Sequence, residues 1–109
     1  MITIKEHSTL KAAAKYTGQI KGVTHGLYNY PAPFSPYFAS AAIETFTTPG
    51  ELVLDPFMGG GTSIIAARVL GRRAVGFDIN PLAYFVARSK SRRLSRQQVS
   101  SIQEWSNHV

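Results

Sequence analysis

The sequence contains no cysteine, which excludes a disulfide framework, a thiol nucleophile and any metal site with cysteine ligands. Its three histidines, His7, His25 and His108, lie far apart along the chain, so we expect no protein-bound metal. No apolar run approaches the roughly 18 residues of a membrane span, and the first twenty residues lack the apolar core of a signal peptide. We therefore expect a cytoplasmic protein without a membrane segment.

Acidic residues are also few: six Asp and Glu face twelve Lys and Arg, for a formal net charge of +6. Eight of the twelve basic residues fall between Arg68 and Arg96. A basic segment of this kind suits a polyanion such as nucleic acid, although a solvated helix face explains the charge equally well. The candidate nucleic-acid contacts are Arg88, Lys90, Arg92 and Arg93.

The length of 109 residues allows one small domain, and the 44% hydrophobic content is ordinary for a globular protein. Residues 1–22 are polar and basic, and we expect an arm with a short helix near residues 9–16. The rest of the chain alternates helices and short apolar runs, which indicates parallel strands in a Rossmann-like α/β sheet. The expected helices are 37–46, 63–71, 82–93 and one starting near Ser95, and the expected strands are 52–54 and 72–78.

The stretch "LDPFMGGGT" places three glycines, Gly59 to Gly61, between the first strand and the next helix. Such a turn lets a ligand approach the backbone closely at the carboxyl end of a parallel strand. No lysine follows the glycines, so the turn is not a phosphate loop, and the spacing of a dinucleotide fingerprint is absent. Asp55 also disfavours a phosphate and suits a cationic centre, whereas Asp78, after the second strand, suits ribose hydroxyls or a helix cap. A nucleoside with a cationic amino-acid tail, S-adenosylmethionine, fits both carboxylates.

The segment from Tyr30 to Ala83, "YPAPFSPYF" through "DPFMGGGT" to "FDINPLA", resembles the DNA amino-methyltransferases that make N6-methyladenine or N4-methylcytosine. This resemblance implies a partial Rossmann-like methyltransferase fold, with residues 23–109 as its cofactor-binding portion. Asp55 would face the methionine end of S-adenosylmethionine, Asp78 would bind the ribose, and Phe34 would line the methionyl side. The implied cofactor-binding residues are Phe34, Asp55, Pro56, Phe57, Gly59, Gly61, Thr62 and Asp78. For Phe34 and Phe57, a buried anchor of the preceding loop is the alternative role.

One motif of that family is missing from the sequence. These enzymes hold the target base against an (Asp/Asn/Ser)-Pro-Pro-aromatic loop, and neither Asp55-Pro56-Phe57-Met58 nor Asn80-Pro81-Leu82-Ala83 matches it. We therefore assign no catalytic residue and expect a fragment: a split subunit or a truncated reading frame. Such a chain would be marginally stable and catalytically silent without a complementary methyltransferase subunit or the missing C-terminal portion.

Two other functions stay open from the sequence. RNA methyltransferases of the tRNA guanine-N2 type carry a similar cofactor loop, so RNA is a less favoured substrate than DNA. A non-catalytic remnant that binds nucleic acid through residues 68–96 is the second alternative.

Overall fold

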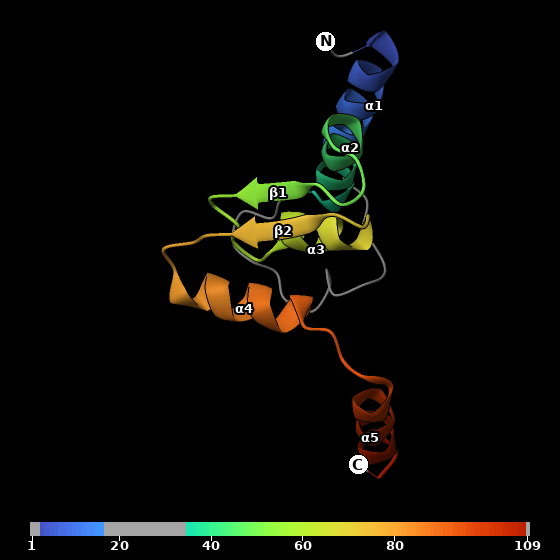
Figure 1. Cartoon of the computed structure of the whole chain (residues 1–109), viewed down its shortest axis with the longest axis vertical. Coiled ribbons are helices and arrows are strands. Elements are labelled where there is room, and N and C mark those ends of the chain that lie inside the picture. Colours follow the sequence, from blue (N-terminus) through green and yellow to red (C-terminus); the bar gives the residue numbers. More distant parts are fainter. Residues whose placement is uncertain (1–2, 17–34, 109) are drawn as a thin grey trace.

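The computed structural model describes residues 3–16 and 35–108 of the chain (Figure 1). Phe34, His25 and the segment from Tyr30 to Phe34 that contributed to the family resemblance lie outside these residues. The described elements follow the order helix, helix, strand, helix, strand, helix, helix. They are α1 (Ile4–Lys15), α2 (Pro36–Phe46), β1 (Leu52–Asp55), α3 (Thr62–Val69), β2 (Arg73–Gly76), α4 (Pro81–Ser91) and α5 (Arg96–Ser106). The alternation of helices and strands from α2 to α4 confirms the expected α/β organisation.

Side-chain caps fix the starts of α2 and α4. The Oγ of Ser35 accepts a hydrogen bond from the amide of Phe38, and the Oδ1 of Asn80 accepts one from the amide of Leu82. Proline follows both caps at the first helical position, where its missing N–H has no intrahelical role. The expected starts of α2 and α4 are therefore confirmed within one residue.

Helix α1 is longer than the sequence led us to expect. It begins at Ile4 and not near residue 9, because Thr3 and Glu6 form a reciprocal capping box. The Oγ1 of Thr3 accepts from the amide of Glu6, and the carboxylate of Glu6 accepts from the amide of Thr3 at 2.7 Å. The hydrogen bond from the Thr3 backbone is the main reason that the pKa of Glu6 lies below its usual value.

Strands β1 and β2 pair in parallel, with Leu52 opposite Arg73 and Asp55 opposite Gly76. The second strand is shorter than the expected 72–78, because the chain leaves the ladder after Phe77, whose amide donates to the Asp55 carbonyl at 2.9 Å. Asp78 therefore lies in the connection to α4, where its Oδ1 accepts from the amide of Asn80 at 2.8 Å.

The core lies on one face of this two-stranded sheet. Helices α2 and α3 pack together there and contribute Ala39, Ile43, Ala66 and Ala67, against which Val53, Leu70 and Ala74 pack. Because side chains alternate along a strand, the next residues point to the other face. There Leu52, Leu54 and Val75 are 52%, 61% and 40% exposed. We call these three residues the open face of the sheet.

The two terminal helices extend the molecule at opposite ends of its long axis (Figure 1). Helix α1 packs on α2, and the rings of Tyr16 and Tyr37 lie 4.4 Å apart between their centroids. Helix α5 stands apart from the sheet and has no buried residue. Within the described residues, the candidate cofactor-binding residues lie at the end of β1, in the turn to α3, at the start of α3 and between β2 and α4.

Candidate functional site

The glycine turn connects the carboxyl end of β1 to α3. Gly59 and Gly61 have positive φ angles of 49° and 81°, a conformation that side chains disfavour. The amide of Gly61 donates to the carbonyl of Met58 at 2.8 Å, which closes the turn. Gly61 is the N-cap of α3 and supplies no capping side chain, so the turn directs backbone N–H groups outward from the start of this helix.

Asp78 is joined directly to this turn. Its Oδ2 accepts a hydrogen bond from the amide of Gly59 at 2.8 Å, and its Oδ1 accepts from the amide of Asn80. The N-cap of α4 is Asn80, so Asp78 does not itself cap this helix but joins the glycine turn to the residue that does. A carboxylate has about four acceptor positions, so two hydrogen bonds leave room for further donors such as ribose hydroxyls. Its role in binding a ribose stays a prediction.

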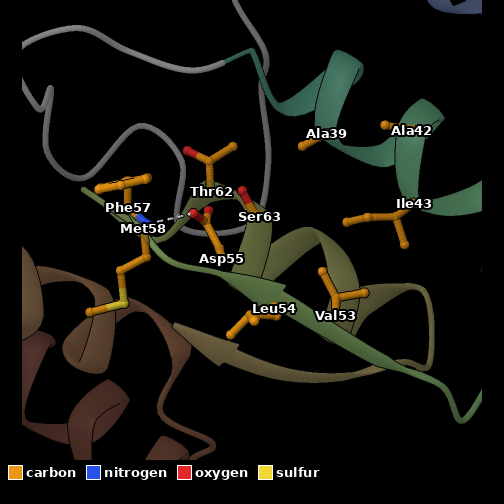
Figure 2. Close-up of a pocket in the computed structure, with 10 residues that line it drawn as sticks. All are labelled: Ala39, Ala42, Ile43, Val53, Leu54, Asp55, Phe57, Met58, Thr62 and Ser63. Carbon is orange, nitrogen blue, oxygen red and sulfur yellow. Dashed lines mark hydrogen bonds between the residues drawn. The ribbon is translucent and has the colours of Figure 1, made fainter. Parts of the chain in front are cut away.

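Asp55 lies at a cavity of about 400 Å³ beside the turn (Figure 2). The Oδ1 of Asp55 accepts from the amide of Phe57 at 3.0 Å, which orients the carboxylate at the end of the strand. Figure 2 shows Asp55 near the hydroxyls of Thr62 and Ser63, with Phe57 and Met58 of the turn beside it. Apolar side chains of α2 and β1 line the rest of the cavity. The lining residues are Ala39, Ala42, Ile43, Val53, Leu54, Asp55, Phe57, Met58, Thr62 and Ser63.

Such a cavity combines mainly apolar walls with one carboxylate and two hydroxyls. Small-molecule sites typically have this composition, with a few polar groups that orient the ligand. The carboxylate favours a ligand with a positive centre over a phosphate. The structure therefore brings together Asp55, Phe57, Thr62 and, through the turn, Gly59 and Asp78.

The other expected site residues have different surroundings. Phe57 is 86% exposed, so it is not the buried loop anchor that was its alternative role. Pro56 is also exposed. Gly61 is buried.

Two of the basic candidates, Arg92 and Arg93, lie away from the cavity. The amide of Gly50, just before β1, donates to the carbonyl of Gly71, so α3 ends at the edge where the strands begin. There Arg68 Nη1 donates to the carbonyl of Ser91 at 2.7 Å, which places the end of α4 at the same edge. Figure 1 shows α4 running back from the arrowheads toward this edge. Residues Arg92 and Arg93 therefore lie at the opposite edge of the sheet from Asp55.

Several basic side chains already contact the protein itself. Arg72 donates to the hydroxyl and carbonyl of Thr47 and to the carbonyl of Leu70, and Arg73 donates to the carbonyl of Gly50. Arg88 donates to the hydroxyl of Tyr84 at 3.1 Å. Lys90 is half-buried, and burial lowers the pKa of its ammonium group. Part of the basic segment thus stabilises loop and helix ends.

The sequence did not indicate a role for Met58, but the structure shows that this residue joins the glycine turn to the end of β2. Its amide donates to the carbonyl of Phe77 at 2.9 Å, and its side chain lies over Gly76. A Cβ on Gly76 would lie 2.5 Å from the Met58 sulfur and 2.8 Å from Cδ1 of Ile64. A glycine inside a strand often marks such a close approach, and that signal was present in the sequence.

Neither a metal-binding cluster nor a membrane-spanning helix is found among the described residues. Among residues 3–16 and 35–108, no group of three His, Asp or Glu side chains is placed to hold a metal ion. In the same part of the chain, no helix has the length and apolar character needed to cross a membrane.

The fold resembles that of a solved structure. The structure superposes on the crystal structure of M1.HpyAVI with a TM-score of 0.54 and 30% identity, over 59% of this chain and 32% of that one. A family model described as DNA methylase, of the N6/N4 type, matches residues 4–88. The chain therefore belongs to the family of N6/N4 DNA methylases.

Three curated relatives illustrate the relationship. They are the type II methyltransferases M.MjaII of Methanocaldococcus jannaschii, M.MvaI of Kocuria varians and M2.DpnII of Streptococcus pneumoniae. Identities are 28%, 35% and 33%, over 72%, 73% and 69% of this chain. The aligned region spans only 15%, 18% and 28% of the relatives' own lengths.

Proposed function

We propose that this chain is the S-adenosylmethionine-binding part of a DNA methyltransferase that modifies N6 of adenine or N4 of cytosine. The observation that carries the proposal is the convergence of Asp55, the glycine turn and Asp78 at one edge of a parallel sheet. Ligands of open α/β sheets bind at this edge.

The residues fit the donor in chemistry as well as in position. Asp55 and the hydroxyls of Thr62 and Ser63 would receive its amino-acid end, where the carboxylate complements the ammonium group. The unused acceptor positions of Asp78 would receive the ribose hydroxyls, while its bond to Gly59 keeps the turn in place. When bound, S-adenosylmethionine supplies a methyl group that its sulfonium already activates. The residues of this chain would therefore contribute binding and orientation.

We further propose that the chain acts together with a complementary methyltransferase part, which is either a separate subunit or a further segment. Two features support this: the sequence lacks the Pro-Pro-aromatic loop, and the relatives are several times longer than the region that aligns. The open face formed by Leu52, Leu54 and Val75 is the kind of apolar surface that the second layer of an α/β sheet would cover.

Calorimetry with S-adenosylmethionine and S-adenosylhomocysteine tests the proposed binding. We expect Asp55→Ala and Asp78→Ala each to weaken binding at least about tenfold, roughly 1.4 kcal/mol. Glu104→Gln is the matched control, because it also removes one negative charge but lies on α5, whose residues are not buried against the sheet. Unchanged affinity in both aspartate variants would refute the assignment of the cavity to the methyl donor.

A transfer assay tests the need for a complementary part. The isolated chain, supplied with methyl-labelled donor and unmethylated duplex DNA, is expected to transfer no label. Measurable incorporation into DNA by the isolated chain would show that its acceptor site is complete.

A further inference from the structure

Gly61 and Ala87 are in unusually close contact. A Cβ on Gly61 would lie 2.8 Å from Cβ and 3.0 Å from Cα of Ala87. Both residues are buried, and Ala87 is only 3% exposed. The side chain of Ala87 on α4 therefore occupies the position beside the last glycine of the turn, with no space left between the two backbones.

Helix α4 is also fixed at a second point. Arg68, near the end of α3, donates a hydrogen bond to the carbonyl of Ser91, near the end of α4. The buried residues Ala83, Val86 and Ala87 form the inward side of α4. Because Arg68 holds the far end of α4, a side chain larger than alanine at position 87 presses on Gly61, which already lies against Ala87.

A shift of Gly61 would spread through the turn. Its amide donates to the carbonyl of Met58, and the amide of Gly59, two residues earlier, donates to Asp78. The N–H groups at the start of α3 follow directly after Gly61. Each of these groups belongs to the region that we assign to the methyl donor, whereas Ala87 itself does not line the cavity.

We infer that Ala87 is a positioning residue: a side chain no larger than its methyl group lets the glycine turn keep its place against α4, and with it the geometry of the donor site. The functional part of this inference rests on the proposed function. A side chain larger than alanine at position 87 displaces the turn and weakens donor binding, while a smaller one leaves binding intact. No direct contact between Ala87 and the ligand is involved.

The contrast between variants at two positions of α4 tests this inference. Ala87→Val adds two methyl groups against Gly61, whereas Ala87→Gly removes the contact but lowers helix propensity. Ala83→Val is the matched control, since Ala83 is fully buried on the same helix, one turn earlier. We expect Ala87→Val to weaken S-adenosylhomocysteine binding at least tenfold. Ala87→Gly and Ala83→Val should stay within about threefold of the original affinity, even where they lower the melting temperature.

A second measurement needs no ligand. Hydrogen exchange at the amide of Gly59 reports its bond to Asp78 in the free protein. We expect Ala87→Val to speed this exchange at least tenfold relative to Ala83→Val, and Ala87→Gly to leave it near the original rate. If Ala87→Val does not fold, Ala87→Ser adds only one oxygen atom to the side chain. It should also weaken donor binding and speed exchange at the Gly59 amide, but by less.

The outcomes separate the inference from the proposed function. If the unsubstituted chain binds no donor but Ala87→Val selectively releases the Gly59 amide, the proposed function fails and the positioning role stands. If Ala87→Val leaves both affinity and exchange unchanged, or if Ala83→Val produces the same losses, Ala87 has no special role and the inference is overturned.

Discussion

The Asp78 carboxylate accepts a hydrogen bond from the Gly59 amide at 2.8 Å, across 19 residues of sequence. Its other oxygen accepts from the amide of Asn80, also at 2.8 Å. One side chain thus joins the glycine turn, the end of β2 and the start of α4. Asp78 therefore has a structural role whether or not a ligand is bound. Experiment can separate this structural role from the proposed role in binding a ribose.

Asp78→Asn is expected to lower stability more than Asp55→Asn. Asparagine has one acceptor oxygen, so at position 78 one of two amide donors loses its partner, which costs roughly 1–3 kcal/mol. At position 55 the single bond from the Phe57 amide can be kept. Urea denaturation followed by circular dichroism measures the free energy of unfolding. Equal losses in the two variants would contradict the structural role of Asp78.

Gly76→Ala is expected to destabilise the protein by overpacking. The added Cβ would lie 2.5 Å from the Met58 sulfur, and such insertions cost roughly 1–3 kcal/mol. Because Met58→Ala removes the sulfur, the double variant should be more stable than the sum of the two single effects predicts, by about 0.5 kcal/mol or more. Strict additivity in the same denaturation experiment would show that the two residues do not compete for this space.

Arg72→Gln and Arg93→Gln remove the same charge but differ in the contacts that they lose. Arg72 donates to two atoms of Thr47 and to the carbonyl of Leu70, so its replacement should lower the unfolding free energy by roughly 1–3 kcal/mol. Arg93 is exposed, and its replacement should change stability by less than about 0.5 kcal/mol. Thermal unfolding of the pair decides whether the basic segment acts on the fold through specific contacts or only through its net charge.

The cap of α1 should depend on pH. Hydrogen bonds from Thr3 hold the pKa of Glu6 below its ordinary value of 4.5. A carboxyl group whose pKa is lower in the folded state than in the unfolded state stabilises the folded state. This contribution is complete when the pH is above the ordinary pKa, and it is lost as the pH falls through the lowered pKa. Carboxyl-carbon NMR should place the midpoint for Glu6 below 4.5, and hydrogen exchange in α1 should accelerate over the same range. Thr3→Ala should return the midpoint only part of the way, because it removes the hydroxyl hydrogen bond and keeps the backbone one, which is the larger cause.

The parts of the fold that depend on local chemistry could be predicted from the sequence. Ser35, Asn80 and Ser95 cap helices through residues two or three positions away, so the signal lies within a few letters. The capping box between Thr3 and Glu6 is equally local, and the early start of α1 was missed although that signal was present.

The remaining features depend on residues far apart in sequence. The contact between Gly61 and Ala87 requires that α4 pack against the start of α3, which no local pattern specifies. The contribution of α2 to the cavity wall also depends on packing between distant segments. In the sequence, Ala39, Ala42 and Ile43 cannot be distinguished from ordinary core residues. Charge counting likewise indicates a basic segment but does not identify Arg72 as a donor to Thr47, 25 residues away.

Because the sheet has an open face, the free energy of unfolding of this chain depends on the concentration of any molecule that covers that face. A molecule that covers Leu52, Leu54 and Val75 binds only the folded form and adds to its free energy of unfolding, by about 2.7 kcal/mol at a hundredfold excess over its dissociation constant. A chain with a one-sided core is expected to rely on such a contribution. Its steady-state amount would then follow the supply of that molecule, because uncovered copies unfold more often and are removed by proteolysis.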